Sequence, residues 1–125
     1  TEEAAEDSPA LLLNAAGKGW NAANLMMTAV IDHYTHHRLK GTQNRREALS
    51  RLTRQHPRSR FGDFEALVEK MFGDLHLRGE EQAEYSVKIL RRRVEEVRSR
   101  LIPLGQELIA EGPGAIFRPP RHRGR

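Results

Sequence analysis

The sequence predicts an all-α protein, and three observations carry this prediction. Apolar residues within residues 80–111 recur at alternating intervals of four and three, the spacing of a helix that packs lengthwise on others. Only seven residues are aromatic and runs of β-branched residues are missing, which argues against a sheet. A chain of 125 residues is the size of one domain with one core. The seam consists of Ala83, Val87, Leu90, Val94, Val97, Leu101, Leu104 and Leu108.

A long helix over about residues 9–39 is the first predicted element. Pro9 suits the first helical position, and the serine before it suits the N-cap. The four-three spacing recurs along this segment, so we expect it to be the antiparallel partner of a second long helix at about 80–110. Gly17 and Gly19 each cost about 1 kcal/mol in a helix interior, so a break between two shorter helices is the alternative.

Two short helices are predicted between the long ones. The first spans about residues 43–55 and stops at His56, because the proline that follows pushes this residue out of the α region. The second spans about residues 64–75, with Asp63 as its N-cap. Residues 76–79 are then expected to turn the chain into the second long helix.

Prolines and glycines predict where the second long helix is interrupted and where it ends. Pro103 is expected to kink or restart the second long helix, and Gly112 with the proline and glycine that follow is expected to end it. The sequence therefore divides into an acidic lead at 1–8, a helical bundle at 9–111 and a basic, irregular tail at 112–125.

Charge is distributed in blocks. The net charge is +4, but residues 38–60 carry eight bases against one acid, and residues 91–125 carry nine against four. Such blocks bind a polyanion or pair with acidic segments of the same bundle. The first block is the best candidate for phosphate contacts, and the tail arginines add a second. The candidate nucleic-acid-binding residues are Arg38, Lys40, Arg45, Arg46, Arg51, Arg54, Arg58, Arg60, Arg118, Arg121, Arg123 and Arg125.

Three histidines gather near the end of the first helix. His33, His36 and His37 are three and four residues apart, a spacing that puts side chains on one helix face, as a metal site requires. His33 and His37 also continue the four-three spacing of the first helix near its end, where imidazoles pack and interact favourably with the helix dipole, so a structural role is expected. The sequence contains no cysteine, no phosphate-cradling glycine loop and no nucleophile elbow. We therefore predict neither a metal nor a cofactor.

Arg51 and His56 are separated by four residues, in the pattern R-x-x-x-x-H. A bundle of two long and two short helices with this pattern resembles the HEPN domains. Residues 20–34 resemble the second helix of that family, and residues 75–101 resemble its closing helix. The resemblance implies a domain that binds nucleotides, nucleic acid or proteins. Many HEPN domains are metal-independent ribonucleases, in which the arginine would hold the scissile phosphate and the histidine would move the proton of the 2′-hydroxyl.

The sequence carries no sign of a membrane span or a secretory signal. No apolar run approaches the roughly 18 residues of a spanning helix, and the acidic start is unlike a targeting peptide. We expect an intracellular, cytoplasmic protein. An organellar protein whose targeting peptide was removed before Thr1 is the alternative.

Three classes of function follow from these patterns. We expect a non-enzymatic basic module that binds nucleic acid, RNA in particular, or belongs to a ribonucleoprotein assembly. The first alternative is a protein-interaction subunit or a homo-oligomer, because two long helices leave apolar seam uncovered in a monomer. In this alternative the tail docks on a protein partner through Ile116 and Phe117. The second alternative is an endoribonuclease that uses Arg51 and His56.

Overall fold

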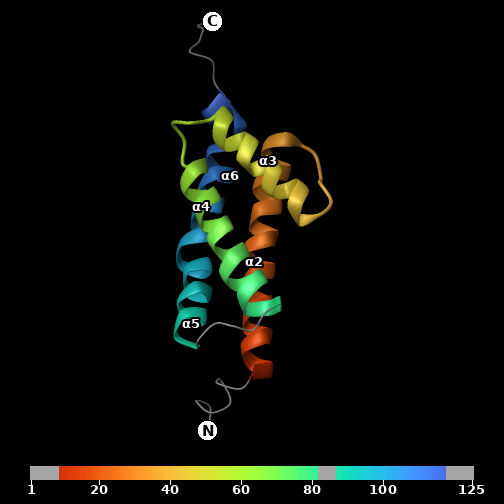
Figure 1. The fold of residues 1–125 in the computed structure, drawn as a ribbon. Helices are drawn as coiled ribbons and strands as arrows, with labels where there is room; N and C mark the ends of the chain where they lie inside the picture. The colour runs from red at the N-terminus through yellow and green to blue at the C-terminus, as the bar shows by residue number, and fades with distance from the viewer. Residues whose placement is uncertain (1–8, 82–86, 118–125) are drawn as a thin grey trace, which may run out of the picture.

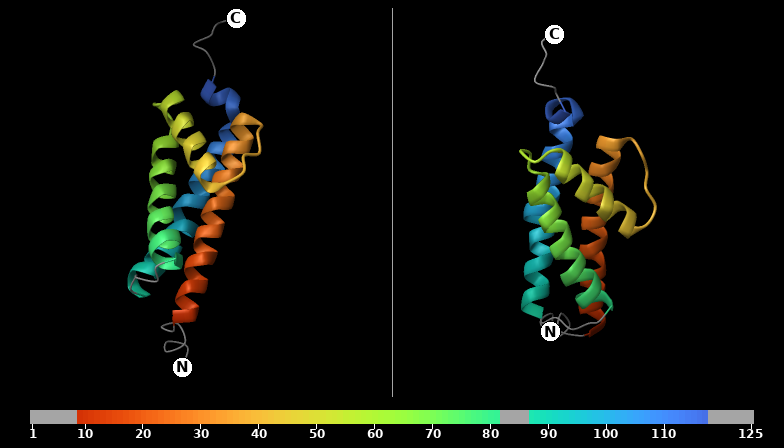
Figure 2. Two further views of the ribbon diagram at one scale, coloured as in Figure 1. Left: turned by 45° about the vertical axis from the view of Figure 1, so that its right-hand side comes forward. Right: turned by 45° about the horizontal axis from the view of Figure 1, so that its top comes forward.

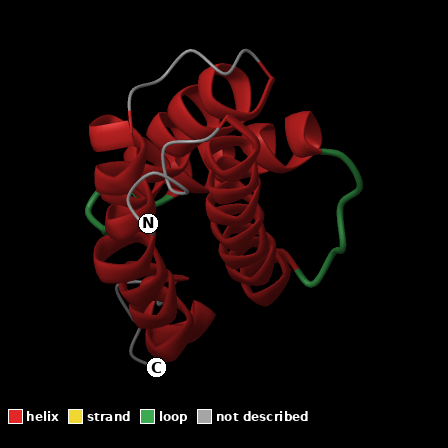
Figure 3. Cartoon of the chain, turned by 90° about the horizontal axis from the view of Figure 1, so that it is seen from below, coloured by secondary structure: helices red, strands yellow, loops and turns green. Residues whose placement is uncertain are grey.

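The computed structural model describes residues 9–81 and 87–117, and the side chains of residues 14–78 and 87–111. Within these ranges the regular structure is entirely helical, as Figure 3 shows from below, which confirms the predicted class. The described residues form four helices, two of them long. Their elements are α2 (Pro9–Thr35), α3 (Thr42–Gln55), α4 (Phe61–Met71) continued by the π-helical η1 (Phe72–Glu81), and α5 (Val87–Glu96) joined by the π-helical η2 (Val97–Leu101) to α6 (Ile102–Phe117).

The two long helices run parallel, so the predicted antiparallel pairing of these helices is wrong. Gly19 near the start of α2 packs against Val94 of α5. Near the end of α2, the Tyr34 hydroxyl donates a hydrogen bond to the carbonyl of Leu108 in α6. The reason is the helix formed by α4 and η1, which returns the chain to the end of the bundle where α2 begins (Figure 1).

The helix α4–η1 is the antiparallel neighbour of the last helix. Arg60 before α4 pairs with Glu107 of α6, whereas Lys70 near the end of α4 pairs with Glu96 of α5. The residue number rises from 60 to 70 along α4 while that of its partner falls from 107 to 96, so the two helices run in opposite directions. α3 crosses the bundle and contacts α2 and α4 (Figure 2).

One hydrophobic core joins the helices, and it confirms most of the predicted seam. Val87 and Val94 are half-buried, and Ala83 lies outside the described residues. The other five seam residues are buried: Leu90, Val97, Leu101, Leu104 and Leu108. α2 faces them with Ala16, Trp20, Ala23, Met27, Val30, Ile31 and Tyr34.

α2 is continuous through its glycines and ends earlier than predicted. Gly19 is buried, and a Cβ at this position would lie 3.0 Å from Leu75 Cδ1, so the glycine permits a close helix approach. The helix ends at Thr35, whose hydroxyl donates to the carbonyl of Ile31. His36 then takes a left-handed conformation with φ of 61°.

The helix α4–η1 begins earlier and ends later than predicted. The Phe61 N–H donates to the hydroxyl of Ser59, so the helix starts there and Asp63 lies in its first turn instead of at its N-cap. The expected turn at 76–79 is helical, because the His76 ring stacks on Trp20 at 5.5 Å and holds this segment against α2.

The last helix accommodates both of its prolines. The π-helical η2 precedes Pro103 and α-helical structure resumes at Ile102, as the predicted restart requires. The predicted end at Gly112 is wrong, because α6 continues to Phe117. Part of the predicted tail is therefore helical.

Candidate nucleic-acid interface

α3 has a buried face and an arginine-rich outer face. Ala48, Leu49 and Leu52 are buried against the bundle. Residues three or four apart share a helix face, so Arg51 and Arg54 lie together away from this apolar side, and both are exposed. The amphipathic pattern of α3 therefore directs these two guanidinium groups into solvent.

The exposed face of α3 continues into the loop before α4. Arg58 in this loop is exposed, and neither it nor Arg51 forms an ion pair with any residue that the structure describes. Arg54 Nη1 donates to the Ser50 hydroxyl at 2.9 Å, a neutral partner that leaves the charge uncompensated. Glu47, the acid nearest in sequence, accepts a hydrogen bond from the amide of Gln43. We call Arg51, Arg54 and Arg58 the arginine face.

Arg46, a predicted phosphate contact, is instead held inside the fold. Its guanidinium donates two hydrogen bonds to Glu69, at 2.9 and 2.7 Å, and its Cζ lies 3.9 Å from the centroid of the Phe72 ring. The hydrogen bonding of Arg46 to the Glu69 carboxylate raises the pKa of Arg46, so the guanidinium stays charged. The sequence offered one signal for this: Glu69 and Phe72 are three residues apart, on one helix face.

Two further arginines of the predicted set also serve the fold. Arg45 donates to the Asn24 side chain at 3.2 Å and to the carbonyl of Leu39 at 3.0 Å, which fastens the start of α3 to α2. Arg60 bridges Glu107 at 3.0 Å and Asp63 at 3.7 Å. The charge of Arg60 is therefore paired, whereas Arg45 is half-buried and its donors are directed at neutral acceptors within the fold.

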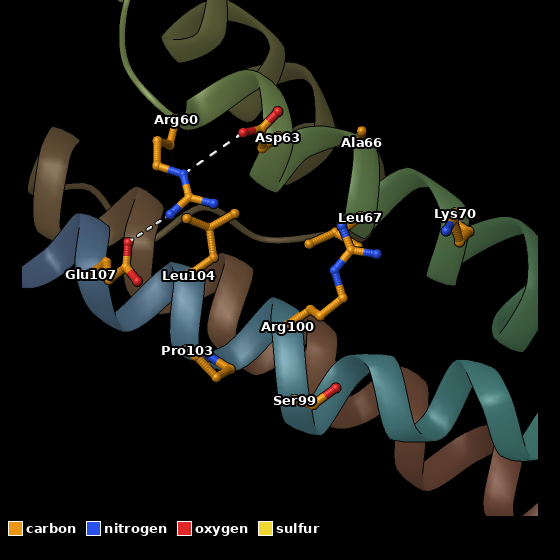
Figure 4. Close-up of a pocket in the computed structure, with 10 residues that line it drawn as sticks. All are labelled: Arg60, Asp63, Ala66, Leu67, Lys70, Ser99, Arg100, Pro103, Leu104 and Glu107. Carbon is orange, nitrogen blue, oxygen red and sulfur yellow. Dashed lines mark hydrogen bonds and ion pairs between the residues drawn. The ribbon is translucent and has the colours of Figure 1, made fainter.

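The Arg60 bridge closes one end of a groove of about 440 Å³ between α4 and the last helix (Figure 4). Further along this groove Lys70 and Arg100 each lie 3.4 Å from the same carboxylate oxygen, Glu96 Oε2. The groove thus pairs its cations with its own acids. It offers a phosphate less uncompensated charge than the arginine face does.

The remaining predicted residues divide between the surface and the undescribed ends. Arg38 and Lys40 are exposed in the loop between α2 and α3. The side chains of Ile116 and Phe117 lie outside the described residues, as do the tail arginines Arg118, Arg121, Arg123 and Arg125.

The candidate catalytic pair is split between the core and the surface. His56 is 7% exposed, and its ring stacks on Phe61 with centroids 5.6 Å apart and lies 6.4 Å from Tyr34. Burial lowers the pKa of His56, which keeps the imidazole neutral. Arg51 lies on the exposed side of the same helix. An open cavity of about 580 Å³ adjoins the histidine, with Arg58 and Glu111 in its lining.

The three histidines of the predicted metal candidate do not share a helix face. α2 ends at Thr35, so His36 and His37 lie beyond it and are exposed. His33 packs edge-on against Tyr34 with centroids 5.3 Å apart, and its buried Nε2 has no hydrogen-bond partner among the described residues. Among the side chains that the structure describes, no group of three potential ligands could hold a metal ion.

Comparison with family models, curated proteins and solved structures finds no match to this chain. The resemblance to HEPN domains therefore rests on the helix pattern and on the R-x-x-x-x-H spacing alone. Among the helices that the structure describes, none is long and apolar enough to cross a membrane.

Proposed function

We propose that this protein is a non-enzymatic helical module that binds RNA, alone or within a ribonucleoprotein assembly, and that its arginine face contacts the phosphates. The observation that carries this proposal is the exposure of Arg51, Arg54 and Arg58 without an acidic partner among the described residues. The tail arginines add charge to the same chain.

Uncompensated surface arginines are suited to a polyanion for two physical reasons. Each phosphate that an arginine neutralises releases condensed counterions, which favours binding at low salt. The planar guanidinium also presents several N–H donors in a fork that matches two phosphate oxygens. The arginine face forms no ion pair with the described residues, so it can bind phosphates without breaking an ion pair within the fold.

The environment of His56 favours binding over cleavage. A general base must come within hydrogen-bond distance of the proton that it removes. His56 lines an open cavity, but its ring is 7% exposed and packed against Phe61. A ribose hydroxyl in that cavity would therefore meet little of the imidazole unless this part of the core opened. The nuclease therefore stays the less supported alternative, with Arg51 and His56 as its pair.

The test compares two triple variants of equal charge. The first triple variant combines Arg51→Gln, Arg54→Gln and Arg58→Gln. It should bind single-stranded RNA at least about tenfold more weakly than the wild type. The slope of the logarithm of the binding constant against the logarithm of the salt concentration should also become shallower, by about 0.7 for each phosphate that the protein no longer neutralises. The control triple, Arg45→Gln, Arg46→Gln and Arg60→Gln, should keep most of the affinity. Circular dichroism establishes that both variants are folded.

Four results would contradict the proposal. Equal losses in both triples would mean that net charge alone attracts RNA, and unchanged affinity in the first triple would exclude the arginine face. RNA cleavage in the presence of EDTA that disappears in His56→Ala would replace binding with the nuclease alternative. Wild-type protein that binds no RNA but co-purifies with a protein partner after nuclease treatment would favour the interaction subunit.

A further inference from the structure

The outer side of α2 carries the most exposed large apolar residue of the described chain. Leu25 is 71% exposed, whereas nearly all other large apolar residues there are at least partly covered. The only comparable case among the described residues is Leu77, at 37%. The prediction of a broadly uncovered seam is therefore wrong for the described residues, and the apolar exposure is concentrated at one point.

Two opposite charges flank Leu25 at equal distances. Lys18 lies seven residues before it and Asp32 seven residues after it, and seven residues are close to two helical turns. The three side chains therefore share one face of α2, opposite the core residues. Lys18 is exposed, Asp32 is half-buried, and neither forms an ion pair with any residue that the structure describes.

The surface beside Leu25 is shaped to admit another helix. An open groove of about 420 Å³ runs along this side, with Thr28 and Ala29 of α2 and Ile109 of α6 in its lining. Residues as small as Ala29 let a second helix approach closely. Arg38 borders the same groove without pairing with Asp32, so the described chain leaves this carboxylate available to an incoming partner.

We propose that the face of α2 with Lys18, Leu25 and Asp32, called here the Leu25 stripe, is the interface of a homodimer. In this dimer α2 of one copy packs antiparallel to α2 of the other, about a two-fold axis at Leu25. In such a pair, a residue a given distance before Leu25 faces the residue the same distance after it in the second copy. Lys18 of each copy then faces Asp32 of the other, and the two leucines meet at the centre. A second copy thus supplies complementary charge at both ends and an apolar contact between them.

The size of this stripe implies a weak, reversible dimer. Two helices in contact bury less surface than a standard interface of about 1,600 Å². Exposed ion pairs orient partners more than they hold them, so burial of Leu25 is the main attraction. The proposal does not depend on RNA binding, because it uses neither the arginine face nor the tail.

Sedimentation equilibrium over a range of protein concentrations tests the dimer. Wild-type protein should associate reversibly, and Leu25→Ser should raise the dissociation constant at least about tenfold. Leu77→Ser removes the other exposed leucine and should leave the constant unchanged. A wild-type monomer at all concentrations would overturn the proposal, as would equal effects of the two substitutions.

A charge exchange tests the antiparallel register. Lys18→Glu and Asp32→Lys should each weaken the dimer, since each places like charges opposite one another at both ends. The double variant restores opposite charges and should recover most of the wild-type association. A double variant weaker than either single variant would contradict the two-fold arrangement.

Discussion

The buried corner around Tyr34 shows how single residues determine the electrostatics of this fold. The Tyr34 hydroxyl is buried and donates to the carbonyl of Leu108. Burial, with a smaller contribution from the charge of Glu111, raises the pKa of Tyr34 to about 12. Burial moves the pKa of His56 in the other direction, because its charged form is the protonated one. Both side chains therefore stay neutral near pH 7.

The buried His56 should make the free energy of unfolding depend on pH. His56 has a lower pKa in the folded state than the usual value near 6.5, so the unfolded chain binds its proton first as the pH falls. Stability should be highest above about pH 6.5 and should decrease on acidification, by up to about 1.4 kcal/mol per pH unit for this one proton. Urea unfolding at several pH values measures the slope.

A variant and a control assign the slope to its residue. His56→Leu replaces the imidazole with an apolar side chain and should flatten the decrease below pH 6.5. His37→Gln, at an exposed position beyond α2, should leave it unchanged. A slope that persists in His56→Leu would place the titrating group elsewhere.

At the scale of helices, glycines and one ion network determine how closely the elements approach. A Cβ at Gly105 of α6 would lie 2.5 Å from Met26 Cγ of α2. Between η1 and α5, Arg93 pairs with Asp74 and with Glu96, and the hydrogen bond to Asp74 raises the pKa of Arg93. The glycine allows parallel helices to pack closely, whereas the ion network joins antiparallel ones.

The glycine contact predicts opposite effects for two identical substitutions. Gly105→Ala should destabilise the protein by about 1–2 kcal/mol, because Met26 is flexible and can relieve only part of the overlap. Gly73→Ala in η1 meets no atom within 4 Å and should stabilise it by about 0.5–1 kcal/mol. Thermal and urea unfolding give both values. Equal effects at the two positions would show that helix propensity, and not the contact with Met26, decides the outcome.

At the scale of the whole molecule, α3 is the least embedded of the four continuous helices. It contributes three buried side chains and crosses the other helices, whereas α2 contributes seven and contacts every other helix. Elements with few buried contacts open at lower free energy. The arginine face therefore lies on the part of the bundle that is easiest to displace.

Native-state hydrogen exchange should resolve this difference. Amides of α3 should exchange by an opening of lower free energy than amides in the middle of α2, whose protection should approach the global value. Exchange measured at increasing denaturant separates the two. Identical free energies for both helices would mean that the described bundle opens as a single unit.

The elements could be predicted from the sequence, but their pairing could not. Spacing alone located the buried side of the last helix at Leu90 and Leu101, because periodicity is a local property. The parallel direction of the two long helices depended on how long α4–η1 is. Burial of Leu75 helps this helix continue through residues 76–79, where the sequence predicted a turn. Likewise, the sequence grouped Arg46 with Arg54 by charge, whereas only tertiary contacts show that Arg46 is paired with Glu69.

The parallel order of the two long helices bears on how fast the chain folds. The contact between Tyr34 and Leu108 joins residues 74 positions apart, so its formation closes a loop of more than half the chain. In a simple helical hairpin the neighbours follow one another in sequence and meet early. Because rates fall as contacts become more distant along the chain, this small helical protein should fold more slowly than its helix content alone would suggest.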